Sequence, residues 1–399
     1  MPDADPQPQP NDCSGADDYP NPMDSATPSF PTMQERLLAE IAESGPLAFP
    51  DFLDLALYHP EQGYYAAGSA QVGRDGDFYT SVSVGPLFGK LLAHRFLKWW
   101  EENGQPAKWR VLEIGAHDGK LAADILAHLA SLSPGAWHAL EYAVAEPLPR
   151  LRTAQEARLR KLSSRLFLAP SLGEIAAQPL PGIAFGNEIL DALPFHLVKM
   201  TEAGWREIRV SSTPEKELVL APSLIPSHSP LSEKLAALGD DFPLNYQTEL
   251  RTNFPDFLQA VSACLENGML LFIDYGFAAP EYYDRHRSNG TLRTFFKHRA
   301  AEDPLDRPGG MDITAHVDFT DLAISAQTVG LSPTEFSTQS SYLTHLAKDL
   351  IIAGELNDKK SIAQFQSLTH PAHLGAKFHA IELRQSPEIP ENVRHRLAL

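Results

Sequence analysis

A short stretch at residues 111–124, VLEIGAHDGKLAAD, has the make-up of a cofactor-binding loop. An apolar run ends in an acid and a glycine, Glu113 and Gly115, and a helical pattern follows from Lys120. Dinucleotide-binding folds need G-x-G-x-x-G, because the backbone must approach a pyrophosphate closely. In that register His117 and Lys120 replace the second and third glycines. The phosphate loop G-x-x-x-x-G-K-[ST] does not occur in the sequence either, so neither pattern supports a nucleotide phosphate here.

S-adenosylmethionine (SAM) suits this loop better, because it carries no phosphate and the loop only has to pass close to its adenosyl and methionine parts. The spacing typical of SAM loops, E/D-x-G-x-G-x-G, falls on Glu113, Gly115, His117 and Gly119. Three of these four positions match, and His117 is the exception. We therefore predict SAM binding by these four residues. The alternative is an ordinary structural turn between a strand and a helix.

Glu146 strengthens the prediction of a nucleoside site. It ends a second apolar run, LEYAVAEP, where a carboxyl edge of a sheet is expected. An acid at that position can accept hydrogen bonds from both ribose hydroxyls, as in nucleoside-binding α/β sheets. The alternative is a helix N-cap ahead of Pro147. With the glycine loop upstream, we favour the ribose role.

Three polar residues, Asn187, Glu188 and Asp191, follow a further apolar run in GIAFGNEILD. Ligands bind beyond the carboxyl ends of strands in open α/β sheets. We expect Glu188 and Asp191 to lie one helical turn apart and to face one cavity. Two such carboxylates would suit a guanidinium, which pairs bidentately with carboxylates. The alternative is a solvated helix start whose acids complement the helix dipole.

Further candidates come from two stretches later in the chain. Asp274 in IDYG could assist from a neighbouring strand edge, and the stretch DITAHVD offers Asp312, His316 and Asp318. His316 is either a proton acceptor or a buried structural histidine. No HExxH, GxSxG or paired CxxC pattern competes with these residues.

The elements that would position these residues alternate between apolar runs and helical patterns after Gly104. Five runs are expected as strands: WRVLEIG, LEYAVAEP, LFLAP, GIAFGNE and GMLLFIDYGF. Short apolar runs separated by helices imply a parallel sheet that is covered on both faces. WREIRV and KELVLAP are expected as a hairpin, and GLSPTEFSTQ and FHAIELRQ as closing strands. The fold class is therefore α/β, with a Rossmann-like sheet.

The predicted organisation has three parts. An acidic, proline-rich tail at 1–31 is too polar to order itself. A helical region follows at 32–104, and the core occupies 105–399 with insertions at about 199–245 and 276–320.

Composition excludes several classes of protein. The chain has 33 Lys and Arg against 51 Asp and Glu, a net charge of −18, which argues against nucleic-acid or anionic-membrane binding. Its two cysteines, Cys13 and Cys264, predict neither a disulfide framework nor a zinc site, and no metal is expected. No apolar stretch approaches the ~18 residues that a membrane span needs. The first residues lack the features of a signal or transit peptide, so we expect a cytoplasmic location.

Several long stretches together resemble the MidA-like family of SAM-dependent methyltransferases, whose mitochondrial members act in respiratory complex I assembly. They are FPDFLDLALYHPEQGYY, GDFYTSVSVGPLFG, VLEIGAHDG, GNEILDALPFH, IDYGF, EYYDRHRSNGTLRTFFKHR and DITAHVDFT. The resemblance covers about residues 33–385 and leaves out the tail.

This resemblance implies a class I methyltransferase fold with inserted substrate elements, and SAM as the cofactor. It also implies methyl transfer to a protein arginine, with symmetric ω-dimethylarginine as the product of the mitochondrial members. Carried over by position, Gly115 and Gly119 would line SAM, Glu146 would hold its ribose, and Asn187 with Glu188 would lie at the reaction centre. The family usually has glycine where this chain has His117.

The expected partner is a protein substrate that bears an arginine, and a respiratory complex subunit is one candidate. We also allow for a homodimer. Two other functions stay open from the sequence: a small-molecule O- or N-methyltransferase, and a non-catalytic assembly factor that keeps the fold.

Overall fold

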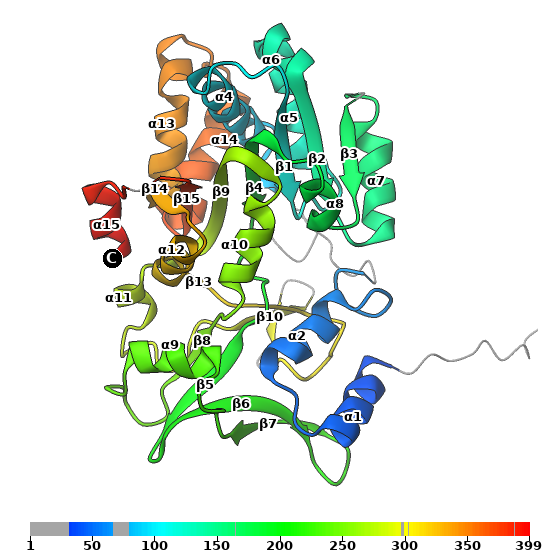
Figure 1. Cartoon of the computed structure of the whole chain (residues 1–399), viewed down its shortest axis with the longest axis vertical. Coiled ribbons are helices and arrows are strands. Elements are labelled where there is room, and N and C mark those ends of the chain that lie inside the picture. The colour runs from blue at the N-terminus through cyan, green and yellow to red at the C-terminus, as the bar shows by residue number, and fades with distance from the viewer. Residues whose placement is uncertain (1–31, 67–79, 164, 297–298, 302, 387) are drawn as a thin grey trace, which may run out of the picture.

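A computed structural model describes residues 32–66, 80–163, 165–296, 299–301, 303–386 and 388–399. The predicted tail at 1–31 and the residues GDFY at 76–79 lie outside this part of the chain. Within it, two lobes are visible: a larger one around a central sheet and a smaller one around a second sheet (Figure 1).

The central sheet of the larger lobe has eight strands, ordered β14-β15-β9-β4-β1-β2-β3, with β13 paired to β9. All five strands that the sequence predicts are present, and each pairs in parallel with its neighbours among them: β1 (Trp109–Ile114), β2 (Leu140–Ala145), β3 (Leu166–Ala169), β4 (Leu180–Asn187) and β9 (Leu265–Phe277). The predicted closing strands, β14 (Ser332–Thr338) and β15 (Phe378–Arg384), join antiparallel at one edge, and the short β13 (Val317–Asp318) joins β9 in parallel. The expected α/β class is confirmed.

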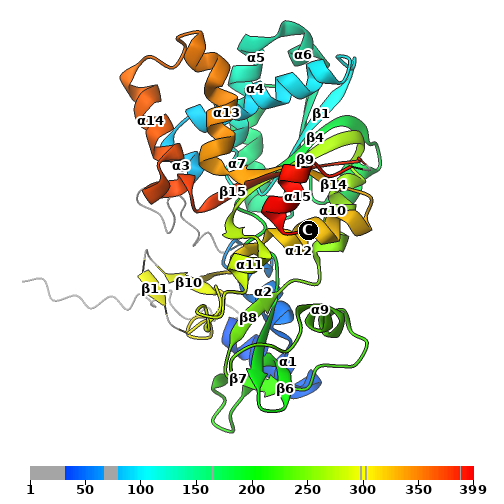
Figure 2. The same cartoon turned by 90° about the vertical axis from the view of Figure 1, so that its left-hand side faces the viewer.

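Each face of this sheet is covered by its own hydrophobic core, because side chains alternate between the two faces along a strand. In β1, Trp109 and Val111 pack into one core and Leu112 into the other. The first core lies under α4 (Leu87–Glu102), α5 (Lys120–Leu132), α6 (Pro134–Ala139), α7 (Pro149–Leu159), α13 (Gln339–Ile352) and α14 (Lys359–Thr369). The second lies under α8 (Leu172–Ala176), α10 (Phe254–Ser262), α12 (Phe319–Thr328) and α15 (Glu391–Leu397). Figure 2 shows α13 and α14 on one side of the sheet and α10 and α12 on the other.

The smaller lobe is built on an antiparallel sheet ordered β7-β6-β5-β8. Its strands are β5 (His196–Thr201), β6 (Gly204–Ser212), β7 (Leu218–Ser223) and β8 (Gln247–Leu250). Helix α9 (Pro230–Leu238) packs against one face of this sheet. The predicted hairpin of WREIRV and KELVLAP is confirmed as β6 and β7. A three-stranded sheet, β11-β10-β12, lies beside it, made of β10 (Arg293–Phe296), β11 (Arg299–Ala301) and β12 (Asp312–Thr314).

The helices expected together at 32–104 are divided between the two lobes. The first two, α1 (Met33–Ser44) and α2 (Phe49–Tyr58), pack against β5 and β6, where Phe49 contacts the ring of Phe195. By contrast, α4 packs on α5 of the larger lobe. The N-terminal segment therefore completes the smaller lobe before the chain enters the larger one.

Three further short elements are α3 (Ser81–Val84), α11 (Ala279–Tyr282) and the π-helix η1 (Pro371–Gly375). In the described ranges, no helix is both long and apolar enough to cross a membrane.

Candidate active site

The loop between β1 and α5 takes its shape from three residues in the left-handed region of backbone space. Gly115, His117 and Gly119 have φ of 72°, 46° and 77°. This region favours glycine, because a Cβ is crowded there. The alternation explains why glycines at every second position mark such a loop. His117 adopts the same conformation at the cost of strain.

The His117 side chain is 36% exposed, and its Nδ1 lies 4.0 Å from Oδ1 of Asp118. Its backbone carbonyl accepts a hydrogen bond of 2.8 Å from Nε2 of Gln155 on α7. The substitution of glycine by histidine thus leaves the loop in the conformation that the glycine pattern predicts. Glu113 lies at the base of the loop, buried in β1. The hydroxyl of Tyr142 donates to Glu113 Oε2 at 2.6 Å, and burial raises the pKa of Glu113 to about 7.

Glu146 lies next to this loop, because parallel pairing sets Ile114 opposite Ala145 at the ends of β1 and β2. Its carboxyl is buried, and burial raises its pKa. Oε1 accepts from the backbone N–H of Leu148 at 3.0 Å, and Oε2 accepts from Nε2 of Gln155 at 3.2 Å. Helix α7 begins later, with Leu148 as its N-cap residue, so Glu146 is not itself the cap.

The strand β4 brings Asn187 to the same edge, since Gly186 pairs with Ile114. The helix start expected after Asn187 is wrong: residues 188–195 contain bends and one turn but no helix, and Glu188 has a φ of 55°. The reason is a long-range contact. Asp274 Oδ2 accepts the backbone N–H groups of Ile189, Leu190 and Asp191 at 3.0, 2.8 and 3.3 Å. A single buried carboxyl group thus accepts the three backbone N–H groups that would point along the axis of a helix. The chain bends around this carboxyl group instead of forming a helix.

Glu188 and Asp191 are nevertheless brought together with Asn187. Oε1 of Glu188 accepts from Nδ2 of Asn187 at 2.8 Å and from the backbone N–H of Ser81 at 3.3 Å. Burial is the main cause that raises the pKa of Glu188, to about 8, and the charge of Asp191 adds to it. Asp191 Oδ2 accepts from the hydroxyl of Tyr275. Burial also raises the pKa of Asp191 and, together with its neighbouring carboxylates, that of Asp274.

Two acceptor atoms of this group have no donor within the part of the chain that the structure describes. They are Oδ1 of Asn187 and Oδ1 of Asp191, both shielded from solvent. Buried polar atoms are almost always hydrogen-bonded in folded proteins. The two atoms, with the carboxyl group of Glu188 beside them, can therefore accept hydrogen bonds from a donor-rich group.

The smaller lobe contributes side chains to this region that sequence reasoning missed. The hydroxyl of Tyr58, on α2, donates to the carbonyl of Ala192 at 2.8 Å. Its ring lies 5.4 Å from that of Tyr65, whose hydroxyl donates to Oδ1 of Asp312 at 2.8 Å. Both tyrosines belong to the stretch that ends in QGYY, but nothing in its local pattern shows what they contact.

Arg251 is a second residue that the sequence did not reveal. Its guanidinium is buried and donates to the carbonyls of Asp191 and Ala315, at 2.8 and 2.9 Å, and to those of Leu193 and His316. It thereby holds the turn after β4 against the segment 312–318.

Of the candidates in that segment, His316 packs edge-on against Tyr275 with ring centroids 5.3 Å apart. Burial lowers the pKa of His316 to about 4, so the imidazole is neutral near pH 7. Asp318 is the N-cap of α12 and accepts from the N–H groups of Thr320 and Asp321, which is a structural role.

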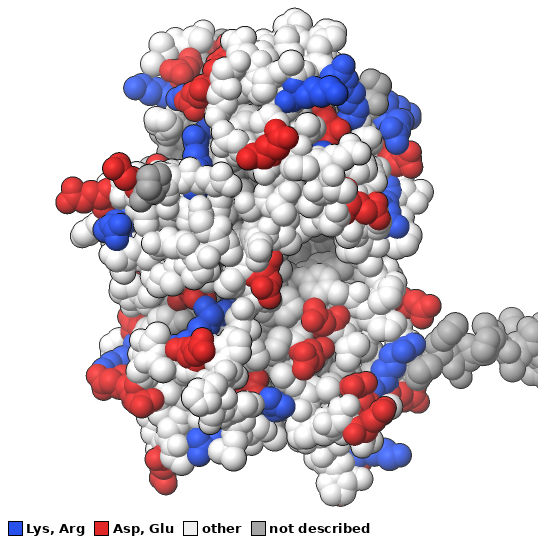
Figure 3. All heavy atoms as spheres, in the orientation of Figure 1, with Lys and Arg blue, Asp and Glu red and all other residues white. Residues whose placement is uncertain are grey.

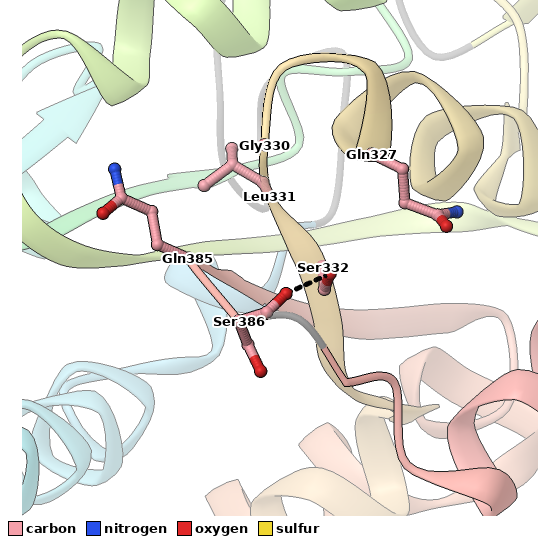
Figure 4. A pocket seen from close by; sticks show the side chains of 6 residues that line it. All are labelled: Gln327, Gly330, Leu331, Ser332, Gln385 and Ser386. Atoms are coloured by element: carbon pink, nitrogen blue, oxygen red, sulfur yellow. Dashed lines mark hydrogen bonds between the residues drawn. The ribbon is translucent and has the colours of Figure 1, made fainter.

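A separate pocket lies at the opposite edge of the central sheet (Figure 4). Its lining residues are Gln327, Gly330, Leu331, Ser332, Gln385 and Ser386. Ser332 pairs with Arg384, which in turn pairs with Met269 near the start of β9, whereas the candidate site lies at the carboxyl ends of the parallel strands. Among the described residues, no group of three or more His, Cys, Asp or Glu side chains could hold a metal ion.

Comparison with known proteins shows several that are similar to this chain. The protein arginine methyltransferase NDUFAF7 homolog of Drosophila melanogaster, named as mitochondrial, is 26% identical over 87% of this chain and 83% of its own. Its counterpart from Rattus norvegicus is 26% identical over 88% and 84%. A crystal structure from Burkholderia thailandensis, described as a "likely methyl transferase" bound to S-adenosyl-homocysteine, shares 32% identity and a TM-score of 0.78 over 88% of this chain and 91% of that one.

A family model described as "Putative S-adenosyl-L-methionine-dependent methyltransferase" matches residues 91–337. This range contains the glycine loop, Glu146 and the turn after β4. The chain belongs to this family of SAM-dependent methyltransferases.

Proposed function

We propose that the protein transfers a methyl group from SAM to the guanidinium of an arginine in a protein substrate. The observation that carries this proposal is the group of Asn187, Glu188 and Asp191, with two buried acceptor atoms that lack donors within the described ranges, one strand away from the glycine loop. A guanidinium supplies five N–H donors and a positive charge. The Drosophila melanogaster and Rattus norvegicus relatives, both named protein arginine methyltransferases, support the same substrate class.

The residues of the loop fit SAM. Gly115 and Gly119 carry no side chain, that of His117 is partly exposed, and Glu146 lies beside the loop with a carboxylate for the ribose hydroxyls. Glu113 supports the loop from within the sheet. When bound, SAM would supply a methyl group whose carbon is the electrophile, and S-adenosylhomocysteine would be the leaving group as the bond from sulfur to that carbon breaks.

The acceptor side has to hold a cation and take up a proton. An arginine side chain has a pKa above ~12 and is charged at neutral pH. Glu188 and Asp191 would orient the guanidinium, and the Oδ1 atoms of Asn187 and Asp191 would accept its N–H groups. As the nitrogen forms its bond to the methyl carbon it gives up one proton. Glu188, with a pKa of about 8, is suited to receive it, because a general base works best with a pKa near the working pH.

The surface around the site favours a cationic partner. Figure 3 shows the face hollowed between the two lobes, with Asp and Glu side chains over α2 and the start of α10 beside the hollow. The exposed acids of α2 are Asp51 and Asp54. Together with the net charge of −18, they would attract a basic segment of a protein substrate.

Finer statements rest on the family resemblance alone. They are symmetric ω-dimethylation of the arginine and a respiratory complex subunit as the substrate. A homodimer and a cytoplasmic location also stay predictions, and the relatives from Drosophila melanogaster and Rattus norvegicus carry mitochondrial names.

Glu188→Gln tests the proposed reaction. The substitution keeps the size of the side chain but cannot take on the negative charge that Glu188 would carry beside a bound guanidinium. Loss of such electrostatic stabilisation typically costs about 10²–10³ in rate. We expect turnover on an arginine peptide, followed by mass spectrometry, to fall by about this factor, while calorimetry shows unchanged SAM binding.

The matched control is Glu174→Gln, an exposed glutamate at the start of α8, which should methylate at the wild-type rate. A Glu188→Gln enzyme with the wild-type rate on the peptide would overturn the proposed role. Transfer to small acceptors but not to arginine peptides would favour a small-molecule methyltransferase, and SAM binding without any transfer would favour an assembly factor.

A further inference from the structure

Gln155, in the middle of α7, connects two parts of the cofactor site that are far apart in the sequence. We infer that Gln155 is a positioning residue for SAM, which orients the carboxylate of Glu146 and fixes the backbone of the glycine loop at the same time. This inference rests on the proposed cofactor site and adds a residue that no sequence motif marks.

The hydrogen bonds of Gln155 define its orientation. Its side chain is fully buried, and Nε2 donates to the carbonyl of His117 at 2.8 Å and to Oε2 of Glu146 at 3.2 Å. Both partners are acceptors, so the amide nitrogen has to face them. The amide oxygen has no donor in the part of the chain that the structure describes. The amide nitrogen of this side chain therefore donates only to the two parts of the cofactor site, the glycine loop and Glu146.

The contacts of Glu146 show what this orientation does for ribose binding. A carboxylate has about four lone-pair positions. The N–H of Leu148 and the amide of Gln155 occupy one on each oxygen. Each oxygen keeps a further position, and two such positions match the two neighbouring hydroxyls of a ribose. Without Gln155, Oε2 would lose its inner donor and the carboxylate could rotate away from this geometry.

The same amide stabilises the strained part of the loop. His117 has a φ of 46° without being glycine, and a Cβ is crowded in this left-handed conformation. Its carbonyl is held by Gln155, which keeps the loop turned. Gly119 lies close to α7, since a Cβ there would be in van der Waals contact with the Cα of Gln155 at 3.6 Å and with the side chain of Leu159 at 3.4 Å. Helix α7 thus lies directly behind the loop.

A ligand comparison separates this role from a general structural one. The probes are S-adenosylhomocysteine and its analogue without the ribose 2′-hydroxyl, and calorimetry gives the Kd of each. In Gln155→Met, which keeps the volume of the side chain, S-adenosylhomocysteine should bind about tenfold more weakly, as for the loss of a hydrogen bond to a charged group. The affinity for the analogue should fall clearly less, because the analogue already lacks one of the hydroxyls that Glu146 holds.

Two further variants complete the experiment. Gln155→Asn keeps the amide but is one methylene shorter, so it should also weaken the binding of S-adenosylhomocysteine. This variant replaces Gln155→Met in the experiment if the methionine variant does not fold. Gln364→Met is the matched control: this buried glutamine accepts the N–H of Leu87, at the start of α4, at 3.0 Å. It should lower the melting temperature without changing either Kd.

The outcomes distinguish this inference from the proposed function. Unchanged Kd values in the folded Gln155 variants, or equal losses of affinity for both ligands, would overturn the positioning role of Gln155 and leave the proposed function standing. If the wild-type protein binds both ligands equally well, the ribose assignment of Glu146 itself fails, and the inference about Gln155 fails with it.

Discussion

At the scale of single residues, the candidate site is defined by carboxyl groups in unusual surroundings. Burial raises the pKa of Glu188 from 4.5 to about 8. The folded protein therefore holds a proton on Glu188 across a pH range in which the unfolded chain has lost it. In that range the free energy of unfolding falls as the pH rises, because the folded state binds more protons.

This linkage predicts a pH-dependent effect of Glu188→Gln, which cannot ionise. The variant should be more stable than the wild type near pH 8, and the difference should shrink as the pH falls to about 5, where both side chains are neutral in the folded state. Urea denaturation at a series of pH values measures it. Parallel stability curves for the two proteins would mean that Glu188 is not buried as a neutral acid.

At the scale of elements, the cofactor loop and the turn after β4 are packed against each other. A Cβ on Gly115 would lie 2.5 Å from Cγ2 of Ile189, the residue after Glu188. Gly115→Ala should therefore move the turn that carries Glu188 as well as the loop. Strain from such overpacking is typically about 1–3 kcal/mol, in addition to the cost of a left-handed alanine.

Gly104→Ala is the matched control for this prediction. Gly104 has a φ of 78°, close to the 72° of Gly115, but a Cβ there would meet nothing within 4 Å. Both variants should lose stability in urea denaturation, and Gly115→Ala should lose more. Turnover should fall only in Gly115→Ala. Equal losses of stability and activity would show that the contact with Ile189 does not matter.

At the scale of the whole molecule, the surplus of acidic residues and the two-lobed shape imply that electrostatic attraction guides the substrate to the site. With a net charge of −18, the protein should prefer arginine peptides flanked by lysines over those flanked by glutamates. The preference should appear in KM at low ionic strength. It should shrink near 1 M salt, where the screening length is about 3 Å. A preference that does not change with salt would point to direct contacts instead of long-range attraction.

Much of the fold could be predicted because it depends on local patterns. The five apolar runs that became β1, β2, β3, β4 and β9 are each long enough to fill a buried strand, and parallel strands need apolar side chains on both faces. Placing Gly115, Glu146 and Asn187 at one edge followed from topology, since the carboxyl ends of parallel strands meet there. The loop keeps its left-handed backbone with His117 in place of glycine, because this conformation is set by the whole turn.

What the sequence alone could not determine depends on contacts between distant residues. The turn after Asn187 was expected as a helix, but Asp274, 83 to 85 residues away, takes its backbone donors. Gln155 reaches His117 across 38 positions, and Tyr58 reaches Ala192 across 134. Helical periodicity and motif spacing describe neighbours along the chain. Which buried carboxyl or amide satisfies a given backbone group is decided only when the lobes and the sheet pack together.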